Sequence, residues 1–150
     1  MRTPMLTLTC TLAITSSAWS ATLDVCPTGC TFASIQDAID ASSDGDVIEI
    51  AAGTYHEHDL SPQQKAITIR GATDLDGMPA TTIDSLGLGD NIMAFFAEGN
   101  DTIIEHLVFT GVAGGGWAAV TMFHARPTMI NCTFVGNETT GIGGGVYNLN

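Results

Sequence analysis

The segments IEHLVFTG (residues 104–111) and MINCTFVG (residues 129–136) decide the fold of this chain. They align without gaps, and each is followed by three consecutive glycines, at 114–116 and 143–145. A repeat with a period in the twenties, short apolar alternations and glycine-rich corners is typical of a solenoid, in which each turn buries its apolar side chains against its neighbours. The sequence therefore predicts an all-β solenoid.

The apolar side chains of the two copies superimpose. The matching pairs are Ile104 with Met129, Leu107 with Cys132 and Phe109 with Phe134. We expect these pairs to stack in neighbouring turns, about 4.8 Å apart. The alternation breaks at Glu105 and His106 and again one repeat later, which predicts a bend between two short strands of one turn. Parallel strands that turn corners and return one rung higher make a right-handed parallel β-helix.

A short helix is predicted upstream of the repeat. Ser34 followed by Asp37 is typical of a helix N-terminus. Four apolar residues fall on one helical face: Phe32, Ile35, Ala38 and Ile39. We predict an amphipathic helix at about residues 34–42 that caps the first rung, where it would cover apolar side chains and unpaired backbone.

Short half-buried strands follow this helix. Residues 47–50 and 66–70 alternate with a period of two, which predicts that their isoleucines point inward. Further strands are expected at residues 82–84 and 92–97. The inward register of residues 92–97 stays open, because Met93 and Phe95 compete with Ile92 and Phe96.

Residues 1–20 are typical of a secretory signal peptide, with cleavage before Ala21. Their apolar run is shorter than the ~20 residues that span a bilayer, so we expect no transmembrane segment in the mature chain. The protein is therefore expected to be secreted or held at the cell surface, with the periplasm as the alternative.

The charge balance is strongly acidic, with 16 Asp and Glu against 4 Lys and Arg. All the acidic residues follow Ser20, whereas Arg2 belongs to the leader, so the mature chain has a formal charge of −13. Such a surface repels nucleic acid, anionic membranes and acidic polysaccharides. Nucleic acid is thus excluded as a partner, and pectin would bind only if cations intervened.

The cysteines indicate one local disulfide. Cys26 and Cys30 flank a Pro/Gly turn in a chain predicted to be secreted, so we expect them to pair. A zinc site would need further ligands nearby, and none follow. Cys132 alternates with Phe134 and is expected to act as a small buried hydrophobe.

Two loops contain candidate metal ligands. Alternation would place His56 and His58 on one side, but a third ligand is not evident, so a polar corner is the competing interpretation. Asp74 and Asp76 precede a glycine, as calcium ligands often do, without the distal ligands of a full calcium loop. We predict no metal site and no cofactor, with calcium as the one candidate.

Other candidate functional residues lie in the repeat. Glu105 and His106 could form an acid/base pair, although no orienting partner is evident and a solvated bend explains them equally well. Trp117 and Tyr147 follow the two triple glycines at nearly matching positions. They are the predicted substrate-binding residues, since aromatic rings stack on sugars, and the competing interpretation is packing against a glycine corner.

Two segments resemble a known superfamily. FASIQDAIDASSDGDVIEIAAGTYHE (residues 32–57) resembles the start of pectin-lyase-like β-helix proteins, with its SIQxAIDxA helix, D-G-D turn and G-T-Y-x-E motif. NCTFVGN (residues 131–137) and GGGVYN (residues 143–148) are similar to coils of secreted bacterial right-handed β-helix repeat proteins. The resemblance implies this fold and secretion, with the chain as an N-terminal part of such a protein.

The resemblance does not carry an activity with it. Residues 53–57 match the GxYxE motif of pectin methylesterases, but the catalytic aspartates of those enzymes have no counterpart. The vWiDH-like segment of polysaccharide lyases is absent, and Arg70 is the only basic residue on a predicted strand. Residues 134–137 match the F-x-x-N repeat of bacterial surface proteins, which implies a surface or adhesive role.

The sequence thus predicts a helix cap and about four coils over residues 21–150. The last coil is expected to be incomplete, because the strand after Gly145 would begin near position 158, and its open rung would continue in further sequence or pair with another chain. The predicted function is a non-catalytic module that binds glycans or surface proteins. The alternative is the N-terminal part of a polysaccharide lyase or carbohydrate esterase with its active site beyond residue 150.

Overall fold

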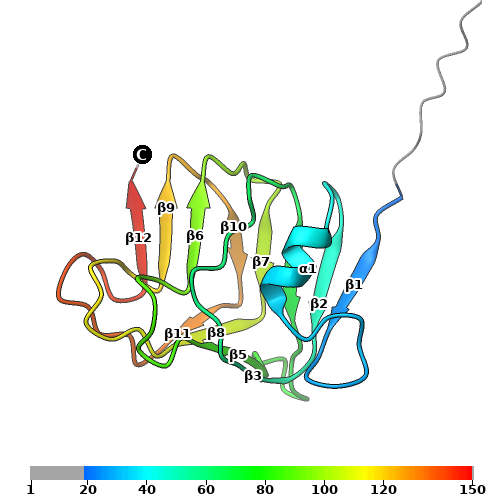
Figure 1. The fold of residues 1–150 in the computed structure, drawn as a ribbon, viewed down its shortest axis with the longest axis horizontal. Coiled ribbons are helices and arrows are strands. Elements are labelled where there is room, and N and C mark those ends of the chain that lie inside the picture. The colour runs from blue at the N-terminus through cyan, green and yellow to red at the C-terminus, as the bar shows by residue number, and fades with distance from the viewer. Residues whose placement is uncertain (1–18, 150) are drawn as a thin grey trace, which may run out of the picture.

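The computed structural model describes residues 19–149, which form about five turns of a parallel β-solenoid (Figure 1). The predicted signal peptide falls almost entirely on residues 1–18, outside the described residues. Within residues 19–149, no helix has the length and apolarity needed to cross a membrane.

Three parallel sheets run along the solenoid. Sheet A consists, in spatial order, of β1 (Thr22–Val25), β2 (Val47–Ile50), β4 (Thr68–Gly71), β7 (Ile103–Glu105) and β10 (Thr128–Ile130). Sheet B consists of β3 (Gly53–Tyr55), β5 (Thr81–Asp84), β8 (Leu107–Thr110) and β11 (Thr133–Phe134). Sheet C consists of β6 (Met93–Phe96), β9 (Val120–Phe123) and β12 (Val146–Leu149). The all-β solenoid prediction is confirmed.

The solenoid has about one turn more than the four expected. The additional turn is the first one, in which β1 pairs in parallel with β2 along its whole length. The last three turns each contribute one strand to every sheet, and β12 is the strand that the last turn adds to sheet C.

The core consists of side-chain rows that run from turn to turn. In sheet A, Ile48, Ile69 and Ile104 are fully buried and directly paired in register. In sheet B, the rings of Phe109 and Phe134 stack with centroids 5.2 Å apart and planes 11° from parallel. The predicted stacking of the repeat is therefore confirmed. Both the inward isoleucines and the aligned phenylalanines follow from the alternation of side chains along a strand.

Cys132 packs against this core without being fully enclosed. Burial raises the pKa of its thiol, which keeps the side chain protonated and apolar in character. Its predicted role as a small hydrophobe agrees with this environment.

The bend between β7 and β8 lies where the alternation breaks. His106 has φ +59° and the matching Asn131 has φ +48°, so both residues adopt the left-handed conformation at the corner between sheets A and B. Histidine and asparagine tolerate this region better than most residues. The predicted bend is confirmed.

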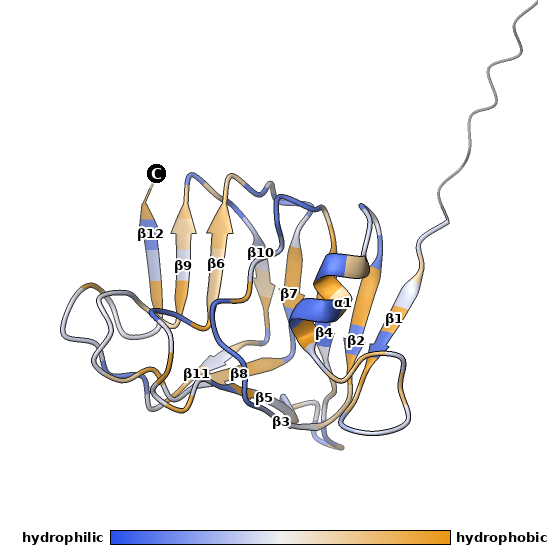
Figure 2. Ribbon diagram, viewed as in Figure 1, coloured by the Kyte–Doolittle hydropathy of each residue, from blue (hydrophilic) through white to orange (hydrophobic). Residues whose placement is uncertain are grey.

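The predicted helix is α1 (Ile35–Ala41), which Ser34 caps by accepting the Asp37 N–H at 3.3 Å. Its apolar residues Ile35, Ala38 and Ile39 are fully buried. α1 contacts β1 and β2 at the N-terminal end of the solenoid, and Figure 2 shows both hydrophilic and hydrophobic stretches along it. The helix lies against the first turns, as the capping prediction required.

Two charged side chains from the second turn hold the ends of α1. The Glu57 carboxylate accepts the N–H groups of Ile35 (2.7 Å) and Gln36 (3.1 Å) and the Ser34 hydroxyl (3.1 Å). The Lys65 ammonium donates to the carbonyl oxygen of Ile39 at 2.6 Å. Both contacts satisfy main-chain groups that a helix end leaves without partners, and their charges oppose the helix dipole.

The connections between sheets B and C are long in the later turns, and Figure 1 shows them grouped at the lower left of the solenoid. Main-chain hydrogen bonds join successive loops, for example from Gly87 N–H to Gly111 O at 2.7 Å and from Gly114 N–H to Glu138 O at 3.0 Å. The two triple glycines thus lie in stacked corner loops beside sheet C.

Candidate functional site

The two predicted sugar-binding residues come together on the outside of sheet C. The ring of Trp117 lies 5.8 Å from that of Tyr147, with the planes tilted by 46°. Trp117 also meets the ring of Phe123 edge-on, at 5.3 Å and 77°. Trp117 lies at the end of the corner loop, just before β9, and Tyr147 lies on β12. Their contact therefore joins two successive turns.

A fourth aromatic residue extends this group. Phe96 on β6 pairs in register with Phe123 on β9, and their rings stack at 5.2 Å and 12°. Phe96 is 47% exposed, while Trp117, Phe123 and Tyr147 are half-buried. We call these four residues the aromatic face.

The open register of residues 92–97 is resolved by this arrangement. Within β6, Met93 and Phe95 are fully buried in the core and Phe96 points outward, while Ile92, which precedes β6, is also fully buried. Because Phe96 and Phe123 are paired in register, both rings lie on the outer surface of sheet C.

Small residues lie on the outer face of sheet C beside these aromatic rings. Thr121 pairs with Tyr147 in β12 and with Ala94 in β6, and both Thr121 and Ala94 are buried although they face outward. The Trp117 ring contacts Phe123 and Tyr147, which neighbour Thr121 along its strand and across the sheet. Trp117 therefore packs on the rings of sheet C.

The aromatic face is electrically neutral. The strands β6, β9 and β12 read MAFF, VTMF and VYNL and contain no Asp, Glu, Lys or Arg. Sheet A differs, because Arg70 on its outer side lies 2.7 Å from Glu49 and also contacts Glu105. The aromatic face can therefore bind a ligand by ring stacking and hydrophobic contact, without charge pairing.

The predicted acid/base pair is not assembled. Glu105 and then Glu49 raise the pKa of Arg70, so Glu105 is part of an ion-pair row across sheet A. His106 turns the corner, where its Nδ1 lies 3.0 Å from Asn131 Nδ2. The bend is confirmed, but the two side chains are not simply solvated, because Glu105 pairs with Arg70 and both residues are half-buried.

Three of the candidate metal ligands, His56, His58 and Asp74, make other contacts in the protein. His56 Nδ1 lies 3.9 Å from Asp84 Oδ2, whereas His58 Nδ1 lies 2.9 Å from Asp59 Oδ2. Asp74 Oδ1 accepts main-chain N–H groups at 2.9 and 2.8 Å and so closes its own turn. In the part of the chain that the structure describes, no three His, Cys, Asp or Glu side chains gather as a metal would require.

The G-T-Y-x-E motif has a structural role. The Tyr55 hydroxyl donates toward the carbonyl oxygens of Ala51 (3.1 Å) and Val25 (3.3 Å), and Glu57 caps α1. The motif thus fastens the second turn to the first turn and to the helix. Cys26 and Cys30 form the predicted disulfide in the loop beside it, with Cα atoms 5.5 Å apart.

Comparison of the chain with known protein families, with curated proteins and with solved structures found no match. The class of protein that the structure itself defines is a parallel β-solenoid with a helix across its first turns. The resemblance to pectin-lyase-like proteins stays a prediction from residues 32–57.

Sequence reasoning missed two members of the aromatic face, Phe96 and Phe123. Their signal was that one follows the other by about one turn of the solenoid. The signal was hidden because the alternation of residues 92–97 fits two registers. Trp117 and Tyr147 were found because each follows a triple glycine, although Tyr147 pairs in register with Thr121 and not with Trp117.

Proposed function

We propose that this chain is a secreted or cell-surface module that binds polysaccharide through the aromatic face and is not itself an enzyme. One observation carries the proposal. Trp117 and Tyr147, from two different turns, lie 5.8 Å apart on the outside of sheet C and keep part of their surface exposed. Flat, partly exposed rings on a rigid sheet offer stacking surfaces for sugar rings.

The ligand we favour is a neutral polysaccharide. The strands beneath the aromatic face carry no charged residue. The whole chain has a formal charge of −12, which disfavours uronate-rich chains at long range. Neutral sugars stacked on aromatic rings avoid this repulsion.

The disulfide supports the proposed location. Disulfides such as Cys26–Cys30 persist in oxidising compartments and are rare where thiols are kept reduced. Together with the predicted signal peptide, this favours a place outside the cytoplasm.

The contacts of the polar side chains support a non-catalytic role. Glu105 and Glu57 are bound to Arg70 and to α1, respectively, and His106 contacts Asn131. The two carboxylates are thereby engaged in structural contacts rather than paired with His106 as an acid/base couple. The alternative proposal is the N-terminal part of a polysaccharide lyase or carbohydrate esterase whose active site lies beyond residue 150.

Tryptophan fluorescence tests the binding proposal directly. Trp117 is the single tryptophan of a chain that begins at Ala21, because the full chain has 2 and the other, Trp19, lies in the predicted signal peptide. We expect xylan, mannan or a β-glucan to change its emission, and polygalacturonate to have little effect with or without calcium. Trp117→Ala or Tyr147→Ala should weaken retention by the bound polysaccharide in affinity electrophoresis about fivefold, since stacking contributes on the order of 1 kcal/mol.

Leu75→Ala is the matched control, because Leu75 is a fully exposed apolar residue far along the chain from the aromatic face. It should leave retention unchanged, and circular dichroism should show that all variants are folded. Unchanged binding by Trp117→Ala, or no binding to any polysaccharide, would contradict the proposal. Release of unsaturated or de-esterified products by this chain would favour the enzyme alternative instead.

A further inference from the structure

The first turn leaves the position next to β3 without a strand. Sheet A begins with β1 in the first turn, but sheet B begins one turn later with β3. β3 pairs with β5 on one side, and within residues 19–149 no strand pairs with its other side. β3 is therefore the open edge of sheet B.

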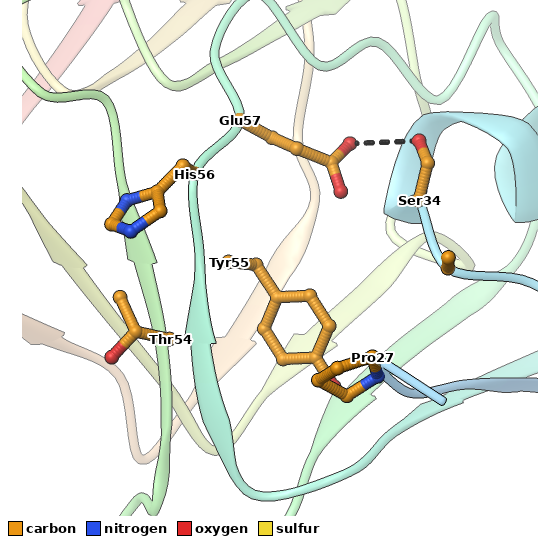
Figure 3. A pocket seen from close by; sticks show the side chains of 7 residues that line it. Pro27, Ser34, Thr54, Tyr55, His56 and Glu57 are labelled. Atoms are coloured by element: carbon orange, nitrogen blue, oxygen red, sulfur yellow. Dashed lines mark hydrogen bonds between the residues drawn. The ribbon is translucent and has the colours of Figure 1, made fainter. Parts of the chain in front are cut away.

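A groove lies along this edge. Its volume is about 320 Å³, and Figure 3 shows residues of the first turn on one side and residues of β3 and its continuation on the other. The lining residues are Pro27, Ala33, Ser34, Thr54, Tyr55, His56 and Glu57. We call it the β3 groove.

The main chain of Thr54 faces the open side. In a parallel ladder, alternate residues of a strand direct their N–H and C=O groups to opposite neighbours. Gly53 donates its N–H to Ala80 O, at the start of β5, so the groups of Thr54 point away from β5. A strand placed in the β3 groove would form main-chain hydrogen bonds with the N–H and C=O groups of Thr54.

The walls of the β3 groove are fixed before any ligand arrives. Pro27 lies within the disulfide loop, and Tyr55 is anchored through its hydroxyl to Ala51 O at 3.1 Å. Glu57 is held by three hydrogen bonds from the start of α1. A rigid groove lowers the entropy cost of ordering a bound peptide.

From these observations we infer that the β3 groove binds an extended peptide, which adds to sheet B as a further strand beside β3. Unpaired strand edges are templates for such pairing, and main-chain hydrogen bonds supply the affinity. The site is separate from the aromatic face, which lies on sheet C. It gives the protein a second binding activity, toward an extended segment of another protein.

The peptide is basic. Among the described residues, Glu57 is the one carboxylate that lines the groove and no Lys or Arg lines it, and the lining residue His56 lies 3.9 Å from a second carboxylate, that of Asp84. A second copy of this chain carries the same formal charge of −12 and would be repelled. Charge complementarity therefore selects a Lys-rich or Arg-rich strand over self-association.

Hydrogen exchange tests the inference with the full chain. The probe is a capped peptide of alternating Val and Lys, titrated by fluorescence anisotropy and then added at saturation. We expect exchange of the Thr54 amide to slow about tenfold, while amides of β9 are unchanged. A peptide with Glu in place of Lys, and one with N-methylated Val residues, should each bind at least about tenfold more weakly.

Two variants distinguish binding in the β3 groove from nonspecific effects of the peptide. Ala33→Trp fills the groove and should abolish binding, whereas Met78→Trp, on an exposed loop, should not. Equal binding by the N-methylated peptide, or full binding by a folded Ala33→Trp variant, would overturn the inference. Protection of the Thr54 amide by dimerisation would show that a second copy of the chain occupies the groove. Protection that disappears when residues 1–18 are removed would show that this segment occupies it. Either result would also overturn the inference.

Discussion

The first and the last described turns of the solenoid differ in how their apolar side chains are covered. At the N-terminal end, α1 lies against β1 and β2 and buries all three of its apolar residues. In the last turn, Met129, Cys132 and Phe134 continue the core rows but are only partly buried, and Val146, which pairs with the buried Val120, is 43% exposed. The same side-chain rows run to both ends, but among the described residues only the first turns are covered by a helix.

This difference shows that a turn of a solenoid depends on contacts with its neighbours. Each turn is stabilised mainly by the turn on either side, so an end turn has only one such neighbour. α1 supplies the missing contacts at the N-terminal end, with main-chain groups satisfied by Glu57 and Lys65. We therefore expect local unfolding to be less frequent at β2 and β4 than at β10, β11 and β12.

Removing the apolar contact of the cap should have the largest effect. Ile39→Ala deletes most of a fully buried side chain, and large-to-small changes of this kind cost about 2 to 5 kcal/mol. Urea unfolding should show this loss, and hydrogen exchange should become faster at β2 before it does at β9.

The matched change at the other end is Val146→Ala. Val146 is 43% exposed, so we expect a loss of only about 0.5 kcal/mol. Equal losses for Ile39→Ala and Val146→Ala would show that α1 does not stabilise the end of the solenoid.

Removing the polar anchor of the cap should come next. Glu57→Ala leaves the N–H groups of Ile35 and Gln36 without their acceptor, which should cost about 2 kcal/mol in the free energy of unfolding. Thermal and urea unfolding measure this loss. Glu138→Ala removes an exposed carboxylate from the last turns and should change stability by less than about 0.5 kcal/mol.

The sequence predicted the helix and the first strands correctly, but it did not predict the contacts of Glu57 and Lys65 with the helix ends. The predicted strand at residues 47–50 has the bounds of β2, and α1 lies within the predicted 34–42. These elements follow from alternation and capping within a few residues. Glu57 and Lys65 act on a helix that precedes them by about one turn of the solenoid, so finding them required the register between turns.

The register was hidden because the turns differ in length. The aligned residues of sheet A are Thr22, Val47, Thr68, Ile103 and Thr128. The step from Val47 to Thr68 is the shortest and the step from Thr68 to Ile103 is the longest, so no single period fits the whole chain. The repeat was visible only in the last two turns, and so Trp117 could be related to Tyr147 but Phe96 could not be related to Phe123.

Lys65 tests the C-terminal end of α1. Lys65→Met keeps the aliphatic stem but removes the hydrogen bond to Ile39 O and the favourable charge near the helix end, which should cost about 1 kcal/mol. Arg126→Met, an exposed cation near the other end, should have almost no effect on the urea midpoint. A larger loss of stability for Arg126→Met than for Lys65→Met would contradict the prediction that the Lys65 charge stabilises the end of α1.

Asp46 gives the N-terminal end a dependence on pH. Hydrogen bonds from the N–H groups of Ala21 and Ser43 lower the pKa of its carboxyl group. A carboxyl whose pKa is lowered by folding stabilises the protein above its unfolded pKa of about 3.9, and this contribution is lost as the pH falls through the folded pKa.

Asp46→Asn should therefore unfold more easily than the unmodified chain near neutral pH, and the difference should shrink below about pH 4. Urea unfolding across this range measures it, with Asp90→Asn, an exposed carboxylate, as the control. A difference that grows on acidification would mean that the contact with Ala21 and Ser43 does not favour the charged form.

The smallest expected effect depends on the predicted cleavage before Ala21. The Ala21 nitrogen lies 2.7 Å from Asp46 Oδ1, so in a chain that begins at Ala21 this nitrogen becomes an ammonium group facing the carboxylate. Acetylation of that amino group keeps a donor but removes the charge, and should cost about 0.5 kcal/mol, as exposed ion pairs do. The cost should vanish in Asp46→Asn, whereas an equal cost in both backgrounds would mean that the new N-terminus makes no ion pair with the first turn.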